Sequence, residues 1–279
     1  MSDLPVPSIA STGVRVVDLA QGIAQGLLDL LFPPRCVSCG RSGAILCSTC
    51  LADVRAPTEP LCERCGSPLP GSSIRTLCET CVEGRGPVTL DGLRVAAVYE
   101  GTIRKAIHAL KFEGKRRAAQ PLGALLAVAY HRSTGAGMAA DLIIPVPLHV
   151  DRARARGYNQ AALLARVTAA RLRMPVAENV LIRQRATQSQ VDLSWRARRV
   201  NVTGAFALAN PQVASRIAGK RILLIDDVAT TGSTLDAAAQ ALFAAGPASV
   251  WGLAVARPAL RHTSGVQPPL ASNDSDMVE

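Results

Sequence analysis

Four Cys-x-x-Cys pairs place the narrowest limits on how this chain can fold. All eight of its cysteines lie in these pairs, which are Cys36/Cys39, Cys47/Cys50, Cys62/Cys65 and Cys78/Cys81. Two residues between thiolates let one tight turn present both sulfur atoms to a single tetrahedral ion. A segment of this length cannot build a hydrophobic core by itself, so the free energy of metal binding becomes free energy of folding. The pattern predicts a small module with two structural zinc ions at residues 35–85.

The four pairs can be combined into two sites in three ways. Gly40 and Gly66 each follow a second cysteine, whereas Leu51 and Val82 follow the other two pairs, so the segment has the pattern of a duplicated unit. Glycine permits the positive φ that turns backbone N–H groups toward the sulfur atoms, and closing neighbouring loops costs less entropy than crossing them. We therefore expect neighbouring pairs to share an ion. One site would hold Cys36, Cys39, Cys47 and Cys50, and the other Cys62, Cys65, Cys78 and Cys81.

Apolar residues recur at helical spacing ahead of the cysteines and predict an amphipathic helix over residues 13–34. Charged and amide side chains interrupt this stretch, so neither a signal peptide nor a transmembrane segment is predicted. We accordingly expect a cytoplasmic, reducing location, where cysteines bind metal more often than they form disulfides. A single Cys-x-x-Cys pair would also be typical of a thiol redox site, but four such pairs within 46 residues favour metal. The module could contact nucleic acid or serve as a platform for the larger domain or a partner.

The net charge of +10 is concentrated in the second part of the chain. Residues 91–260 hold 23 Lys and Arg against 10 Asp and Glu. Such an excess predicts an anionic partner, namely phosphate, pyrophosphate or nucleic acid; the alternative is a cationic surface that only aids solubility. From residue 262 to 279 the chain turns polar and rich in Pro and Ser, which predicts a flexible tail.

The most informative segment joins an apolar strand to an alanine-rich helix. Residues 222–225 are consecutively apolar, as in a strand buried on both faces, and Asp226 and Asp227 follow them. A short loop then leads into a helix that starts near Leu235. Backbone N–H groups and the positive end of a helix dipole would there surround one phosphate, and two adjacent acids would suit a ribose diol or Mg²⁺. The candidate phosphate-binding residues are Ala229, Thr230, Thr231, Gly232, Ser233 and Thr234.

This segment resembles the phosphoribosyl pyrophosphate signature of type I phosphoribosyltransferases, in which an apolar strand and two acids precede a Thr-Thr-Gly-x-Thr loop. The resemblance implies an α/β fold with a central, mostly parallel sheet, here over residues 91–260. It also implies that Asp226 and Asp227 are the catalytic acids, which hold the ribose hydroxyls directly or through Mg²⁺. Oxopurine enzymes of that family carry a third acid where this chain has Thr230, so oxopurine salvage is disfavoured.

Two arginine-bearing segments complete the predicted site. A second buried strand over residues 141–147 precedes Arg154 and Arg156, whose guanidinium groups suit bidentate contact with phosphate. In the family that this chain resembles, the corresponding loop binds pyrophosphate, and a later flexible loop closes over the reacting centre. Arg183 and Arg185 begin the matching segment here. The alternative for both segments is a solvated basic helix.

Three features restrict the resemblance to one subgroup of this family. They are the cysteine pairs, the Arg-Gly-Tyr-Asn-Gln run at residues 156–160, and Lys111 within His-Ala-Leu-Lys-Phe-Glu-Gly. Together they resemble the ComF/GntX family of double zinc ribbon, phosphoribosyltransferase-like proteins. This implies an enzyme that releases pyrophosphate and is associated with natural competence and DNA uptake, with phosphoribosyl pyrophosphate, single-stranded DNA and other DNA-uptake proteins as partners. The alternative is a non-catalytic accessory protein that binds nucleotides or single-stranded DNA.

Overall fold

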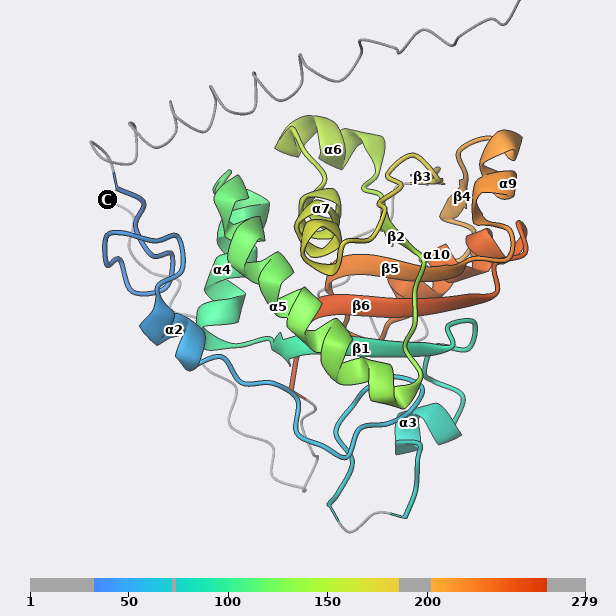
Figure 1. Cartoon of the computed structure of the whole chain (residues 1–279), viewed down its shortest axis with the longest axis horizontal. Helices are drawn as coiled ribbons and strands as arrows, with labels where there is room; N and C mark the ends of the chain where they lie inside the picture. Colours follow the sequence, from blue (N-terminus) through green and yellow to red (C-terminus); the bar gives the residue numbers. More distant parts are fainter. Residues whose placement is uncertain (1–32, 72–73, 186–201, 260–279) are drawn as a thin grey trace, which may run out of the picture.

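Four parallel strands form the central sheet in the order β1-β6-β5-β2 (Figure 1). They are β1 (Gly92–Val98), β2 (Leu142–Pro145), β5 (Arg221–Val228) and β6 (Ser249–Arg257). The predicted mostly parallel sheet is thus confirmed. This computed structural model describes residues 33–71, 74–185 and 202–259. Nearly all of the predicted leading helix, most of the predicted flexible loop and the predicted tail lie outside the described residues.

Strand β5 is buried on both faces, and this explains its run of consecutive apolar residues. Successive side chains of a strand point to opposite faces. Leu223 and Ile225 accordingly pack in one hydrophobic core, whereas Ile222 and Leu224 pack in another. The same alternation directs Asp227 toward the face of Leu223 and Ile225.

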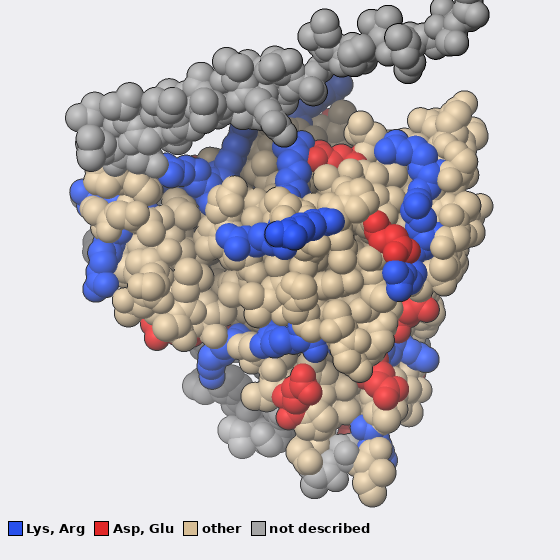
Figure 2. Space-filling model, in the orientation of Figure 1, with Lys and Arg blue, Asp and Glu red and all other residues tan. Residues whose placement is uncertain are grey.

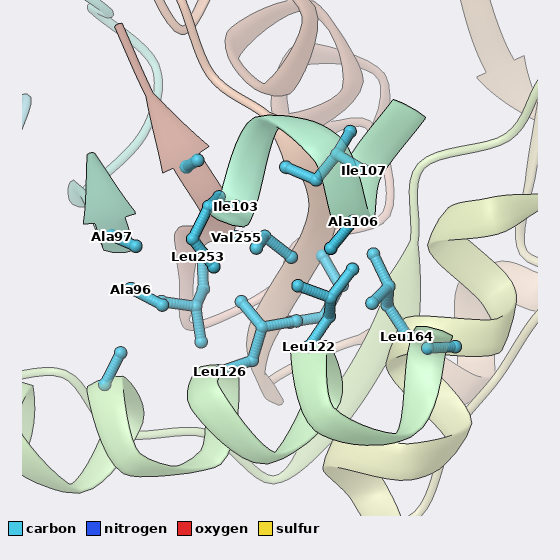
Figure 3. Close-up of a cluster of buried hydrophobic side chains, with 14 of the residues drawn as sticks. Ala96, Ala97, Ile103, Ala106, Ile107, Leu122, Leu126, Leu164, Leu253 and Val255 are labelled. Atoms are coloured by element: carbon cyan, nitrogen blue, oxygen red, sulfur yellow. The ribbon is translucent and has the colours of Figure 1, made fainter. Parts of the chain in front are cut away.

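The first core lies between the sheet and three helices, α4 (Gly101–Phe112), α5 (Ala119–Ser133) and α7 (Gln160–Leu172). Figure 3 shows Ile103 and Ile107 of α4 meeting Leu122 of α5 and Val255 of β6. These four side chains are almost completely buried. Helix α4 is thereby fixed with its C-terminal end close to the carboxyl ends of the strands.

The opposite face of the sheet is covered by α10 (Ser233–Phe243) and a short antiparallel pair, β3 (Leu181–Arg183) and β4 (Phe206–Leu208). Leu235, Ala238 and Leu242 of α10 are buried there. The remaining elements are short: α6 (Val150–Arg156), α9 (Ala214–Ile217), and the 3₁₀ turns η1 (Arg116–Ala118), η2 (Thr134–Ala136) and η3 (Pro211–Val213). Among the described residues, no helix combines the length and the apolar character needed to cross a membrane.

The cysteine-rich module consists of two copies of one local structure. Gly40 and Gly66 both have positive φ, of 78° and 68°, as the duplicated pattern predicts. Two short helices follow, α2 (Ser48–Ala52) and α3 (Glu79–Val82), and each is preceded by a cysteine with nearly the same backbone angles. In Figure 1 the copy with α2 lies near the end of β1 that leads into α4, and the copy with α3 lies below β1 in this view.

Candidate functional site

A cavity of about 950 Å³ opens at the carboxyl ends of β2 and β5. This edge of an open parallel sheet is where α/β proteins usually bind ligands, and the volume suits a small molecule. Its charged lining residues are Lys111, Arg152, Arg156, Arg183, Asp226 and Asp227. Four cations therefore face two acids, and this balance favours an anionic ligand.

Asp227 forms a buried ion pair with Lys111, which comes from the last turn of α4. Lys111 Nζ lies 2.5 Å from Asp227 Oδ1, and the two side chains are 23% and 4% exposed. Burial alone would lower the pKa of Lys111, but the charges of Asp227 and Asp226 and the hydrogen bond to Asp227 outweigh it and raise this pKa. Asp227 Oδ2 is buried and has no hydrogen-bond partner among the described residues. The carboxylate thus keeps one oxygen for a ligand.

The neighbouring carboxyl group, Asp226, is held in an environment that disfavours its charge. Burial at the cavity floor and the nearby charge of Asp227 raise the pKa of Asp226 to about 7, against an ordinary value of 3.8. Lys111 and the backbone N–H of Asp227, which donates to Asp226 Oδ1 at 2.8 Å, act in the opposite direction. A bound cation, or two hydroxyl groups that donate hydrogen bonds, would stabilise the charged form of Asp226.

Replacing Asp226 with asparagine should remove part of the pH dependence of stability. A raised pKa means that the folded protein binds a proton more tightly than the unfolded chain. The free energy of unfolding of the parent should therefore fall as pH rises from about 4 to about 7, the interval between the two pKa values. Asn cannot ionise, so Asp226→Asn should be more stable than the parent at pH 8. Urea denaturation at pH 5 and pH 8 measures this difference.

The same substitution at Asp141 provides a control of opposite sign. Hydrogen bonds from Arg221 hold the pKa of Asp141 at about 2, at the other end of β5. A lowered pKa contributes stability that is present at neutral pH and is lost in acid. Asp141→Asn should accordingly lower stability at pH 8. An Asp226→Asn variant whose stability changes with pH as that of the parent does would contradict the raised pKa of Asp226.

We call residues 229–234 the hydroxyl loop; they follow β5, and their last two residues, Ser233 and Thr234, are the first residues of α10. Gly232 has φ +80°, and a Cβ at this position would lie 2.8 Å from Leu93 Cδ2, so any other residue would strain the backbone and displace Leu93. Within the described residues, the backbone N–H groups of Thr230, Thr231 and Gly232 have no acceptor. The N–H of Ala229 instead donates to the Ala256 carbonyl. Three available donors at a helix N-terminus form a cradle for an anion.

Two of the four predicted arginines reach the cavity and two do not. Arg156 and Arg183 line it together with Asp226 and Asp227. Arg154 and Arg185 are exposed and are not among the lining residues, and Arg185 donates to the Thr203 carbonyl. Because residues 150–156 form a helix, side chains four residues apart share a face. The helix therefore brings Arg152 to the cavity beside Arg156 and turns Arg154 away. The i, i+4 spacing of Arg152 and Arg156 could have identified Arg152 from the sequence.

Arg152 lies close enough to Arg183 to disfavour the charge of Arg183. The pKa of Arg183 is lowered by burial and by the charge of Arg152, while Asp226 opposes this shift. Arg183 also lies over the ring of Phe206, at 5.3 Å from its centroid. Like charges gathered around one cavity are typical of a site that binds a multiply charged anion.

The Arg-Gly-Tyr-Asn-Gln run fixes the position of the arginine that opens it. Gly157 ends α6 in the left-handed conformation, and the hydroxyl of Tyr158 donates to the Leu110 carbonyl. Asn159 caps α7 and donates to the Val146 carbonyl at 3.1 Å. Arg156 Nη1 donates to the buried Gln160 at 2.5 Å. Arg116 lies over the ring of Tyr158, at 4.6 Å from its centroid, so a cation covers one face of this ring.

Replacing Lys111 with methionine should destabilise the protein by leaving the carboxylate of Asp227 without its partner. Removal of one member of a buried ion pair typically costs about 3 kcal/mol of unfolding free energy. The double variant Lys111→Met/Asp227→Asn should recover part of this loss, because no buried charge is then left unpaired. Chemical denaturation of the parent, both single variants and the double variant gives the coupling energy. Additive losses would show that the pair does not interact.

The eight cysteines gather into two separate clusters. The first cysteine cluster holds Cys36, Cys39, Cys47 and Cys50, and the second cysteine cluster holds Cys62, Cys65, Cys78 and Cys81. Within each cluster the sulfur atoms all lie within 4.8 Å of one another. This confirms the predicted pairing of neighbours, and four thiolates at this spacing fit one structural zinc ion per cluster.

Comparison with known proteins agrees with both parts of the structure. Residues 27–82 match the double zinc ribbon domain family, and residues 155–263 match the phosphoribosyl transferase domain family. "DNA utilization protein YhgH" of Escherichia coli O157:H7 is 35% identical over 74% of this chain and 87% of its own length. "Competence protein F" of Haemophilus influenzae is 33% identical over 79% of this chain and 96% of its own length. "Competence protein ComFC" of Bacillus subtilis is 27% identical over 73% and 80%, respectively.

Proposed function

This chain belongs to the competence protein F family of double zinc ribbon proteins with a phosphoribosyltransferase domain, and on that premise we propose that it is a phosphoribosyl transferase. It would bind phosphoribosyl pyrophosphate with Mg²⁺, transfer the phosphoribosyl group and release pyrophosphate, in support of DNA uptake. One observation carries the proposal. The two carboxyl groups of β5, Thr230 and Thr234 of the hydroxyl loop, and three arginines all line a single cavity.

The lining of the cavity matches the parts of this substrate. The N–H groups of Thr230, Thr231 and Gly232 would bind the 5′-phosphate at the N-terminus of α10. Asp226 and Asp227 would accept hydrogen bonds from the two ribose hydroxyls. Arg152, Arg156 and Arg183 line the same cavity and would offset the charge of pyrophosphate.

The same residues suit Mg²⁺. This ion prefers carboxylate and phosphate oxygens, and Asp227 Oδ2 is a buried carboxylate oxygen without a hydrogen-bond partner among the described residues. Asp226, whose pKa is raised by burial and by Asp227, would hold its charge more readily beside a cation. When bound, the ion would neutralise charge on the leaving pyrophosphate.

Transfer needs no nucleophile from the protein. The bond between the anomeric carbon and pyrophosphate breaks, and its electron pair leaves with pyrophosphate. A nitrogen of the acceptor donates its lone pair to the same carbon and loses a proton to solvent. The sugar carries positive charge in between, and the carboxylates of Asp226 and Asp227 stabilise that charge. Thr230 lines the cavity where oxopurine enzymes carry an acid, so we expect another acceptor class.

Pyrophosphate release over a panel of nucleobases and amines tests this function. The purified full-length protein with Mg²⁺ and phosphoribosyl pyrophosphate should release pyrophosphate in the presence of one class of acceptor. Asp227→Asn serves as the inactive control, and Asp141→Asn, at the far end of β5, as the active one. Binding of phosphoribosyl pyrophosphate without release for any acceptor would contradict the transferase and leave a nucleotide-binding protein.

The basic surface favours single-stranded DNA as a second candidate ligand. Figure 2 shows Lys and Arg side chains in several separate groups on one face, with Asp and Glu beside some of them, and the net charge is +10. The names of the relatives connect them with competence and DNA utilization. Contacts with the phosphate backbone weaken steeply with salt. Filter binding of an oligonucleotide at increasing salt concentration tests this candidate, and failure to retain DNA at low salt would exclude it.

A further inference from the structure

The second cysteine cluster and the hydroxyl loop share one buried side chain, Arg257 at the end of β6. Only 6% of this residue is exposed. We infer that Arg257 is a positioning residue that makes the conformation of the hydroxyl loop depend on metal in the second cluster and not on metal in the first. The consequence for phosphoribosyl binding rests on the proposed function, whereas the coupling itself does not.

Arg257 forms hydrogen bonds to both sides of this junction. Its Nη1 donates to the Cys65 carbonyl at 2.6 Å and to Ser67 Oγ at 2.8 Å. Its Nε donates to the carbonyl of Ala229, the first residue of the hydroxyl loop, at 3.0 Å. Cys65 belongs to the second cluster, so a single guanidinium group connects the backbone of a metal-ligating residue to the loop. A planar guanidinium fixes these three acceptors in one orientation, which the flexible ammonium group of a lysine cannot do.

The turn of the second cluster is also fitted closely against β1. A Cβ at Gly66 would lie 2.3 Å from the Leu93 carbonyl oxygen, and the Leu93 N–H donates to the Arg64 carbonyl at 2.9 Å. Leu93 in turn supplies the methyl group that limits Gly232 of the hydroxyl loop. The buried Arg94 donates to the Cys62 and Glu63 carbonyls. Movement of this turn would therefore be transmitted to the loop by packing as well as through Arg257.

The segment that follows the second cluster secures the other end of the loop. Asp236, in the first turn of α10, accepts hydrogen bonds from three consecutive backbone N–H groups, those of Val88, Thr89 and Leu90, at 2.7–3.2 Å. The hydroxyl loop thus lies between an attachment to the second cluster and an attachment to the segment that follows this cluster in the chain. If the second cluster lost its ion, the first attachment would lose its support, and the second would lose the turn that precedes it.

The first cysteine cluster is attached elsewhere. Ser38 Oγ lies 3.1 Å from Thr102 Oγ1, and Lys105 donates to the Ser38 carbonyl at 2.8 Å, so this cluster contacts the start of α4. Three of its four cysteines, Cys36, Cys47 and Cys50, join the core on the α4 and α5 side of the sheet. It provides a matched comparison, because the two clusters have the same ligands and nearly the same local backbone.

Hydrogen exchange of the ligand-free protein tests the coupling. Cys78→Ser and Cys39→Ser each remove the least buried ligand of one cluster. We expect Cys78→Ser to accelerate exchange of the Ala229 and Asp236 amides by about tenfold or more, as the loss of one charge-assisted hydrogen bond implies. Cys39→Ser should leave these amides unchanged and accelerate exchange at the start of α4. Equal effects of both variants on the hydroxyl loop would overturn the inference.

Substitutions of Arg257 separate positioning from a general loss of structure. Arg257→Met should accelerate exchange of the same amides while the protein retains both metal ions and an unchanged α7. Arg257→Lys should act in the same direction with a smaller effect. If Arg257→Met does not fold, Ser67→Ala, which removes one acceptor, should produce the local change alone. Unchanged exchange at the Ala229 amide in every folded variant would overturn the inference.

Calorimetry with phosphoribosyl pyrophosphate then distinguishes this inference from the proposed function. Arg257 does not line the cavity, so weaker binding by Arg257→Lys would have to act through the loop. We expect affinity to fall by about tenfold. If the variants exchange the loop amides faster than the parent, but the parent does not bind the nucleotide, the coupling is supported and the proposed function is contradicted.

Discussion

Asp227→Asn should reduce affinity for phosphoribosyl pyrophosphate by at least about 100-fold, because two charge-assisted hydrogen bonds at roughly 1.5 kcal/mol each are then lost or weakened. The asparagine keeps the size of the side chain but removes the charge that faces Lys111 and the cavity. It would also remove a ligand for Mg²⁺. Isothermal titration calorimetry with Mg²⁺ present measures the change.

Two controls make this result specific. Asp141→Asn changes the same residue type at the opposite end of the sheet, where Asp141 pairs with Arg221, and should bind like the parent. Circular dichroism of Asp227→Asn should match that of the parent, since the substitution nearly preserves volume. Undiminished binding by a folded Asp227→Asn protein would exclude the assignment of this carboxylate to the ribose.

Removal of zinc should have the largest effect on stability. We expect two zinc ions per chain by elemental analysis, one for each cluster. Structural zinc contributes on the order of 10 kcal/mol to the folding of small modules, and about 1 kcal/mol shifts the Tm of a domain of this size by about 2–4 °C. A strong chelator should therefore lower Tm by more than about 10 °C, with early proteolysis within residues 33–85.

Restoration with different ions identifies the metal. Thiolates prefer zinc to magnesium, so Zn²⁺ should restore Tm after the chelator is removed and Mg²⁺ should not. Magnesium added to the zinc-loaded protein should affect nucleotide binding and leave Tm almost unchanged. A chelated protein with the Tm of the parent would contradict structural roles for both clusters.

Sequence patterns predicted those features that depend on short stretches of chain. The cysteine clusters could be assigned because four ligands within neighbouring turns leave few ways to surround an ion. The parallel strand at β5, its two acids and the loop with Gly232 followed from one continuous segment. The positive φ at Gly40 and Gly66 followed in the same way from their place after a cysteine pair.

Sequence patterns did not place side chains whose position depends on helix geometry or on a distant partner. Arg154 was predicted from its place after the strand at residues 141–147, but α6 is a helix that turns Arg154 away and brings Arg152 to the cavity. The Lys111–Asp227 pair depends on how α4 packs against the sheet, and no local pattern indicates it. The roles proposed for the cavity residues remain predictions.

The sequence alone thus determined the family, the metal clusters and the strand that carries the acids, because each depends on residues close together in the chain. Only the tertiary structure decided which cations face those acids and how Arg257 joins the second cluster to the hydroxyl loop. Such contacts link residues far apart in the chain, and their geometry is set by the burial of apolar side chains on both faces of the sheet.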